Sequence, residues 1–318
     1  MPSRNEIFHE VTKQKNEALG QSKAMQDVVR RQYLNDLAAY TQRDTIIMSS
    51  SFTSVSIAGM NIPSTFLSIS NADIQGFMSS FHNLKNDKLD IIIHSPGGTI
   101  DAAEQIVNYM RSKYDHIRAI IPQNAMSAAT MIACACDEII MGKHSAIGPI
   151  DPQISYINPD GTPFSAPAQA ILDEFERAKL EIANDPESAA VWVRRMDRYP
   201  IGFLQICDNS IDRSKKCVSE WLSKWMLKDN PNKRLPRKIS NWLCNTKEHI
   251  THGKPINKDV ASEHGLKVIS LEEDGELQDK VLSVFHATMA THEMTHCVKL
   301  IENHEGKGAY LTLNIEKN

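Results

Sequence analysis

The amino-acid sequence predicts an α/β fold with a parallel sheet at its centre. Three short apolar segments, at residues 89–93, 117–121 and 138–141, are typical of buried parallel strands, which carry hydrophobic side chains on both faces. Two segments with helical spacing of apolar residues, 100–113 and 127–136, separate these strands. Strands that alternate with helices are joined by right-handed crossovers, so this order favours helices packed on a parallel sheet.

The composition is that of an ordinary globular protein. Hydrophobic residues make up 41% of the 318 residues and charged residues 23%, so the chain can bury a large core. The net charge of −4 attracts neither nucleic acid nor an anionic membrane, and we expect neither as a partner. One local excess of positive charge contains two prolines and predicts a solvated loop, with a nucleic-acid patch as the alternative. Its basic residues are Lys228, Lys233, Arg234, Arg237 and Lys238.

The cysteines and the apolar segments favour a cytoplasmic protein. The six cysteines form no Cys-x-x-Cys pair, so neither a zinc ribbon nor a thioredoxin-like site is predicted. The first 21 residues lack the apolar core of a signal peptide. The longest apolar run, residues 125–141, is interrupted by Ser127, Asp137 and Glu138 and is too short to span a bilayer. Reduced thiols agree with this expected location.

The remaining segments extend the sheet and add helices around it. Residues 16–42 have the periodicity of an amphipathic helix, which predicts an arm packed on its own domain or on a sister subunit. The other expected elements are a strand at 45–48, a looser β-like stretch at 52–58, a Pro- and Gly-rich loop at 148–167, helices at 169–183 and 219–226, turns with a short helix at 249–268, and a helical stretch at 282–302.

Two of the expected strands end in residues suited to acyl transfer. That chemistry needs a nucleophile, a base and hydrogen-bond donors for the developing oxyanion. The strand at 89–93 runs into Ser95-Pro96-Gly97-Gly98, and Ser127 opens a helix after the next strand. Because the carboxyl ends of parallel strands meet at one edge of a sheet, the backbone N–H groups of Gly98 and Ala128 are expected to flank one carbonyl oxygen. Alone, the serine could be an N-cap and the glycines a simple turn, but the pair is far more specific.

The same residues carry a resemblance to a known family. The strand ending in Ser-Pro-Gly-Gly, the small-residue helix after Ser127, and the segment 145–151 (Ser-Ala-Ile-Gly-Pro-Ile-Asp) resemble landmarks of the Clp-protease/signal-peptide-peptidase superfamily. The segments 251–256 (Thr-His-Gly-Lys-Pro-Ile) and 264–268 (His-Gly-Leu-Lys-Val) are similar to the C-terminal signature of its serine dehydrogenase proteinase (SDH) family. The resemblance covers residues 43–290 and implies a Clp/crotonase-like fold with repeated ββα units.

The resemblance also implies a triad of Ser127 as nucleophile, His252 as base and Asp151 as orienting acid. Each has a simpler explanation, because Asp151 precedes Pro152 and could start a turn, and His252 precedes a glycine and could lie on the surface. Clp proteases have a histidine in the stretch that here offers Asp151, so the base remains open. The alternatives are His144, Lys143 and Lys179, and a lysine base would have to be buried.

These observations predict a serine peptidase that cleaves a peptide or protein substrate through an acyl-enzyme on Ser127, without a cofactor. We expect an N-terminal helical arm (1–42), a Clp/crotonase-like peptidase domain (43–290) and a C-terminal helical extension (291–318). The resemblance implies a homo-oligomer. Two alternatives are a catalytically silent scaffold and a crotonase-like enzyme that acts on an acyl thioester through the paired N–H groups alone.

A competing motif lies near the C-terminus. Residues 292–296 read His-Glu-Met-Thr-His, which matches the His-Glu-x-x-His pattern of zinc metallopeptidases. In that pattern two histidines on one helix face bind zinc and the glutamate, here Glu293, acts as the base. His292 and His296 would be ligands, and His304 could be a third. The flanking polar residues, the short remaining chain and the twelve histidines of the sequence weaken this alternative.

Overall fold

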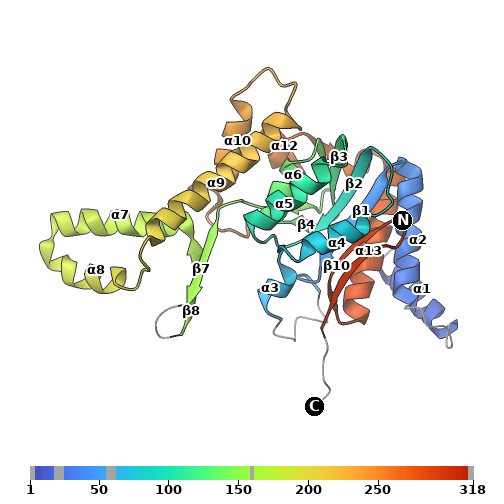
Figure 1. The fold of residues 1–318 in the computed structure, drawn as a ribbon, viewed down its shortest axis with the longest axis horizontal. Coiled ribbons are helices and arrows are strands. Elements are labelled where there is room, and N and C mark those ends of the chain that lie inside the picture. Colours follow the sequence, from blue (N-terminus) through green and yellow to red (C-terminus); the bar gives the residue numbers. More distant parts are fainter. Residues whose placement is uncertain (1–3, 18–24, 55–61, 158–160, 314–318) are drawn as a thin grey trace, which may run out of the picture.

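The computed structural model describes residues 4–17, 25–54, 62–157 and 161–313, and it has an α/β architecture (Figure 1). A seven-stranded sheet forms its centre, in the order β11-β10-β1-β2-β3-β5-β9. Its strands are β1 (Asp44–Ser50), β2 (Lys88–His94), β3 (His116–Ile121), β5 (Glu138–Met141), β9 (Val268–Ser270), β10 (Cys297–Asn303) and β11 (Gly308–Thr312).

Helices cover both faces of this sheet (Figure 1). The longer ones are α1 (Arg4–Glu17), α2 (Met25–Thr41), α4 (Asp73–Ser80), α5 (Ile100–Arg111), α6 (Ala128–Cys134), α7 (Ala168–Asn184), α8 (Ala189–Met196), α9 (Phe203–Lys224), α10 (Leu235–Leu243) and α13 (Gly275–Met294). Shorter turns of helix are α3 (Ser64–Leu67), α11 (Thr246–His249), α12 (Lys258–Glu263), and the 3₁₀ turns η1 (Pro186–Ser188) and η2 (Leu271–Glu273).

Five neighbouring strands, from β1 to β9, are mutually parallel, as the apolar segments predict. Alternate side chains of these strands face opposite ways. Ile92, Ile120 and Ile140 pack on one side with residues of α2 and α13. Ile91 and Ile139 pack on the other side with residues of α5, α6 and α9. The strands are therefore apolar on both faces because both faces are buried.

Repeated ββα units are confirmed. After β2 the chain pairs Ser95 with Ala125. After β3 it forms β4 (Asn124–Ala125), and after β5 it forms β6 (Ala146–Ile147), which pairs with β4. Helices α5 and α6 follow the first two of these short pairings. A small second sheet thus lies at the carboxyl ends of the main strands and holds the segments that carry the candidate residues.

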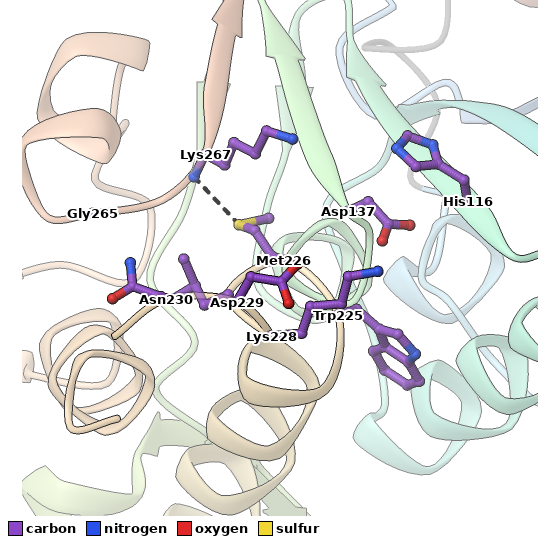
Figure 2. Close-up of a pocket in the computed structure, with 10 residues that line it drawn as sticks. His116, Asp137, Trp225, Met226, Lys228, Asp229, Asn230, Gly265 and Lys267 are labelled. Carbon is purple, nitrogen blue, oxygen red and sulfur yellow. Dashed lines mark hydrogen bonds between the residues drawn. The ribbon is translucent and has the colours of Figure 1, made fainter. Parts of the chain in front are cut away.

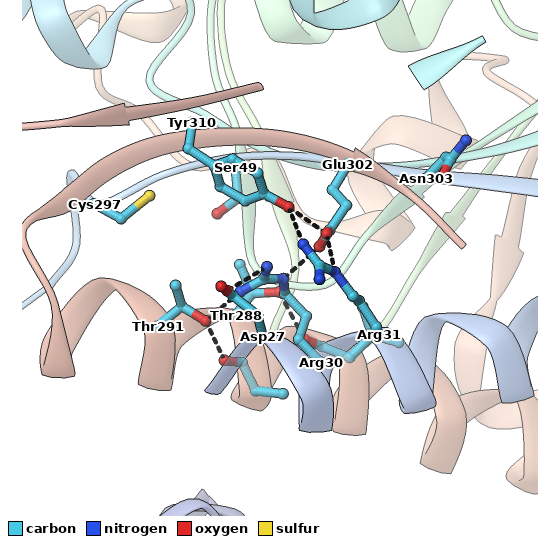
Figure 3. A network of polar contacts seen from close by, with 12 residues as sticks. Asp27, Arg30, Arg31, Ser49, Thr288, Thr291, Cys297, Glu302, Asn303 and Tyr310 are labelled. Carbon is cyan, nitrogen blue, oxygen red and sulfur yellow. Dashed lines mark hydrogen bonds and ion pairs between the residues drawn. The ribbon is translucent and has the colours of Figure 1, made fainter. Parts of the chain in front are cut away.

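The described parts of the predicted N-terminal arm are helical, in α1 and α2, and pack on their own chain, whereas residues 18–24 of the helix expected at 16–42 lie outside the described residues. Helix α2 lies against α13, and a buried polar cluster joins it to the sheet (Figure 3). The Glu302 carboxylate accepts hydrogen bonds from Arg30 Nε at 2.8 Å and Arg31 Nε at 2.6 Å, and also from the Tyr310 hydroxyl. Arg30 also donates to Asp27 at 2.7 Å. Burial alone would lower the pKa of Arg30, but the Glu302 carboxylate outweighs it and the pKa is raised.

The expected C-terminal helical extension is wrong in its second part. Helix α13 ends at Met294 rather than continuing to residue 302, and β10 follows it. The β10 residues Leu300 and Ile301 pair with Ser49 and Met48 of β1 in antiparallel register, and β11 continues the sheet. The reason is non-local, because a strand added to β1 satisfies backbone groups that a longer helix would leave exposed at the sheet edge.

A projecting arm, residues 153–206, was only partly predicted. The expected loop at 148–167 contains a two-stranded hairpin of β7 (Gln153–Ile157) and β8 (Pro163–Pro167). Helix α7 confirms the helical pattern at 169–183, whereas α8 was not foreseen and α9 is much longer than the expected 219–226. The hairpin, α7 and α8 extend away from the layered body (Figure 1).

Three further expectations have definite outcomes. The basic segment is not all loop, because α10 includes Arg237 and Lys238. Of the β-like stretch at 52–58, the described residues 52–54 do not form a strand, and residues 55–58 lie outside the described residues. Across the described parts of the chain, no helix combines the length and the apolar character needed to cross a membrane.

Candidate functional site

Ser127 occupies a strained turn between β4 and α6. Its φ is 53° and its ψ is −120°, a conformation that side chains other than glycine rarely adopt. The side chain makes no capping hydrogen bond, so the N-cap explanation is wrong. Such strain costs about 1–3 kcal/mol and persists only when the surrounding structure enforces it. A sharp strand-to-helix turn of this kind exposes a nucleophile.

Gly97 lets the chain approach this turn closely. Its φ is 96°, and a Cβ at this position would lie 2.6 Å from the Cβ of Ser127 and 2.5 Å from the Met126 carbonyl oxygen. Contacts under 3.0 Å between a Cβ and these atoms are prohibitive. The glycine predicted to shape the turn is therefore required for contact between the two strand ends.

The backbone N–H groups of Gly98 and Ala128 lie outside the hydrogen-bond pairings made by their neighbours. Gly98 lies in a parallel bridge with Ile69, in which Ile69 N donates to Gly97 O at 2.7 Å and Thr99 N donates to Ile69 O at 3.0 Å. The bridge uses the groups flanking Gly98, so the N–H of Gly98 itself points to the opposite side. Ala128 is the first residue of α6, where N–H groups have no partner within the helix.

His252 reaches this edge of the sheet through a distant pairing. Ile256, four residues after it, exchanges two backbone hydrogen bonds with Ile147 of β6, at 2.8 and 3.0 Å. This pairing places the loop beside the segment that ends in Asp151. His252 Nδ1 and Asp151 Oδ1 are 2.8 Å apart, and the exposed fractions of the two side chains are 27% and 5%. The two predicted partners are thus in contact.

One recess brings the candidate groups together. It has a volume of about 360 Å³, and its lining includes Gly98, Ser127, Ala128 and His252. Asp151 lies behind His252 and does not line it. Among the described residues, Ser127 Oγ has no hydrogen-bond partner, so its hydroxyl is not committed to a structural role. Catalytic hydrogen bonds are often long before substrate binds, so this arrangement suits a nucleophile and a base.

A sequence model of ClpP-like SDH-type serine proteinases matches residues 20–301, most of the chain. The chain belongs to this family. The resemblance found in the Ser127, Asp151 and His252 segments is therefore confirmed at the level of the family.

Two individual proteins of one archaeon resemble this member of the SDH-type family over part of their length. The uncharacterized proteins MJ0137 and MJ1495 of Methanocaldococcus jannaschii are 30% identical over 184 residues and 29% identical over 180 residues. These matches cover 58% and 57% of this chain and 54% and 51% of the relatives, so the chain spans about half the length of the curated relatives it matches.

Two solved structures of the 1510-N membrane-bound stomatin-specific protease are also similar. Both are mutant forms, and one contains a substrate peptide. Each is 17% identical with a TM-score of 0.37, and the matches cover 67% and 78% of this chain and 79% and 83% of theirs.

The alternative bases of this SDH-type chain lie elsewhere. Lys143 and His144 are exposed in the turn after β5, and the Lys143 backbone N–H donates to Glu272 at 2.7 Å. Lys179 is exposed on α7, where it pairs with Glu176 at 2.8 Å. None of the three lines the recess that contains Ser127.

The zinc alternative is wrong, because its ligands do not share a helix face. His292 is fully buried, and its Nδ1–H donates to the Cys297 carbonyl at 2.8 Å while Nε2 accepts from the Ser49 hydroxyl at 3.0 Å. Burial lowers its pKa to about 4. His296 lies beyond the end of α13 and is exposed. Over the described residues, no group of three or more His, Cys, Asp or Glu side chains is arranged to hold a metal ion.

A second recess, of about 470 Å³, lies at the opposite edge of the sheet, where β3 and β5 begin (Figure 2). Two of its charged lining residues are engaged, because Asp137 accepts from Arg111 at 2.8 Å and Lys267 pairs with Glu138 at 2.9 Å. The lining residues that the structure describes include no serine, threonine or cysteine, so this recess offers no comparable nucleophile.

One contact of the candidate acid was not predicted from the sequence. Gln153 Nε2 donates to Asp151 Oδ2 at 2.8 Å, on the side of the carboxylate away from His252. The only signal was a side-chain amide two residues after the candidate acid. This spacing does not predict a contact unless the conformation of the turn between the two residues is known.

Proposed function

We propose that the chain is a serine peptidase that cleaves peptide or protein substrates through an acyl-enzyme on Ser127. The strained, uncapped Ser127 carries this proposal, since it shares one recess with an imidazole and two backbone donors. Membership of the SDH-type serine proteinase family supports the same chemistry. The proposal assigns His252 as base, Asp151 as orienting acid, and the N–H groups of Gly98 and Ala128 as the oxyanion hole.

In the proposed reaction, His252 Nε2 takes the proton of Ser127 Oγ as that oxygen attacks the scissile carbonyl carbon. The carbonyl oxygen becomes negative and accepts hydrogen bonds from Gly98 and Ala128. His252 then gives its proton to the leaving amine, and the C–N bond breaks. A water molecule, deprotonated by the same imidazole, attacks the acyl-enzyme and releases the acid and Ser127.

The contact between Asp151 and His252 suits this role. A carboxylate accepts a hydrogen bond from Nδ1–H and so keeps the proton on that nitrogen, which leaves Nε2 as the basic nitrogen of the neutral ring. The same negative charge stabilises the imidazolium that forms during attack. Because Asp151 is buried and His252 is partly exposed, the acid is held in place while the base remains open to the recess.

A fluorophosphonate probe tests this proposal. We expect it to label the native chain once, on Ser127, with the site located by peptide mass spectrometry. The His252→Ala variant should react roughly 10²–10⁴ times more slowly, because general-base assistance contributes that factor. The matched control is His144→Ala, which should react at the native rate because His144 is exposed outside the recess.

Other results would favour other functions. A folded native chain that is never labelled would support the silent scaffold or the acyl-thioester enzyme, and hydrolysis of acyl thioesters without labelling would select the second of these. Equal loss of labelling in the His144 variant would remove His252 as the base.

We also propose that the chain forms a homo-oligomer in the cytoplasm through the projecting arm, residues 153–206. Several large apolar side chains are exposed on this arm, and this excess of exposed apolar surface on one part of the chain supports a contact with another copy. They are Ile157, Leu180, Val191, Val193, Ile201 and Ile206. Six buried free cysteines support a reducing location.

Charge placed on the arm should dissociate the oligomer. Leu180 and Val191 are 66% and 72% exposed in the single chain, so Leu180→Asp with Val191→Asp should leave the fold intact and give a smaller species in analytical ultracentrifugation. Met78→Asp, at an exposed apolar position on α4, serves as the control and should sediment like the native chain. A native chain that sediments as a monomer at all concentrations contradicts the proposal.

A further inference from the structure

Asp151 is nearly buried and has only a small set of partners. The residue is 4% exposed, so water cannot fully solvate its charge. Within the described residues, its Oδ1 contacts His252 Nδ1 and its Oδ2 accepts from Gln153 Nε2, each at 2.8 Å. Gln153 therefore provides the second anchor of the carboxylate.

The hairpin of the projecting arm fixes the position of Gln153. It is the first residue of β7 and lies opposite Pro167 at the end of β8. The backbone just before it is tied as well, because Ala168 N donates to the Pro152 carbonyl at 2.9 Å. The amide nitrogen also lies 3.4 Å from the Asp151 carbonyl oxygen, so it faces two acceptors of one residue. The amide must point its NH₂ group, and not its oxygen, toward Asp151.

We propose that Gln153 is a positioning residue that sets the orientation of the Asp151 carboxylate toward His252. This inference rests on the proposed triad. A carboxylate turns easily about its terminal bond, where the torsional wells are broad. Hydrogen bonds to both oxygens fix the plane of the group, and the orientation of Asp151 in turn fixes the ring of His252. The arm is thereby linked directly to the reacting groups.

A neutral donor suits this position better than a cation. An arginine or lysine at residue 153 would attract the charge of Asp151 and weaken its effect on the imidazolium. The Gln153 amide satisfies Oδ2 without supplying a positive charge. The hydrogen bond from Gln153 stabilises part of the negative charge of Asp151. Without this bond, Asp151 should stabilise protonated His252 more strongly but should be less well oriented toward it.

Two variants separate these effects. Gln153→Ala should lower the maximal rate of fluorophosphonate labelling about tenfold, since a hydrogen bond to a charged group is lost. Because His252 acts as a base only without its extra proton, better stabilisation of the protonated ring moves the acid limb of the pH–rate profile to higher pH. Gln153→Glu places a second negative charge beside Asp151 and should move that limb further in the same direction.

The matched control is Ser155→Ala. Ser155 lies two residues further along β7, is exposed, and pairs with Ser165 of β8 at 3.0 Å without contacting Asp151. This variant should keep both the native labelling rate and the native pH profile. Equal thermal midpoints for the three variants would show that a change in rate does not come from unfolding of the hairpin.

The outcomes distinguish this inference from the proposed function. Native rate and an unmoved acid limb in both Gln153 variants would overturn the inference while labelling of Ser127 still stood. A slower rate with an unmoved acid limb would show that Gln153 only supports the structure of the hairpin, and this result would also overturn the inference. Absence of labelling in the native chain would instead refute the proposed function.

Discussion

Replacement of Ser127 by alanine is expected to abolish peptidase activity and fluorophosphonate labelling while the fold survives. In serine peptidases the loss of the nucleophile reduces turnover by about 10⁶-fold. The fold should persist, because the Ser127 side chain provides no cap to α6. Alanine keeps the same unfavourable φ of 53°, so the free energy of unfolding should stay close to the native value.

A glycine at the same position separates function from strain. Ser127→Gly also lacks the nucleophile and should be inactive, but glycine adopts positive φ without cost, so this variant should be more stable by about 1 kcal/mol. Urea unfolding of the two variants beside the native chain measures the difference. Residual activity in folded Ser127→Ala would assign the nucleophile elsewhere.

The largest expected effect on stability is at Glu302. Its carboxylate is fully buried and neutralises Arg30, which is also fully buried. The Glu302→Ala variant leaves the Arg30 guanidinium with Asp27 as its remaining charged partner in the cluster. Removing one member of a buried ion pair typically costs about 3–5 kcal/mol, so we expect a loss of that size in urea unfolding.

An exposed ion pair in the same hairpin provides the comparison. Lys307 and Glu305 lie in and beside the turn between β10 and β11, with exposed fractions of 38% and 43%. Lys307→Ala should cost less than about 1 kcal/mol, because solvent screens exposed pairs. Similar losses of unfolding free energy in the Glu302 and Lys307 variants would show that burial does not strengthen the ion pair between Arg30 and Glu302.

The parallel part of the fold was predictable because its signals are local. The continuous apolar runs that became β2, β3 and β5 are hydrophobic on both faces, and the segments between them have helical periodicity. The segments that carry Ser127 and Asp151 were found for the same reason, since each lies in the short connection after one of those strands. The Thr-His-Gly segment marked His252, but its contact with Asp151 depends on a pairing between Ile147 and Ile256 that no local pattern records.

The errors arise where distant residues decide the structure. Residues 297–303 contain Lys299 and Glu302, which suit an exposed helix face in isolation. In the folded chain Lys299 pairs with Asp73 at 2.9 Å, and Glu302 pairs with Arg30. These partners allow a charged segment to become a buried strand. The turn at Ser127 likewise lies against Gly97, a distant residue whose lack of a side chain permits the close approach.

The distance along the chain between Asp151 and His252 has a consequence for how the protein is made. The two residues are 101 positions apart, and synthesis at about 5–20 residues per second separates their appearance by roughly 5–20 seconds. During that interval the growing chain contains Ser127 and Asp151 but not the proposed base. A ribosome-bound or prematurely ended chain therefore lacks the group that the proposed mechanism needs to activate Ser127, so the proposed peptidase activity should appear only after the segment around His252 has been made and has folded.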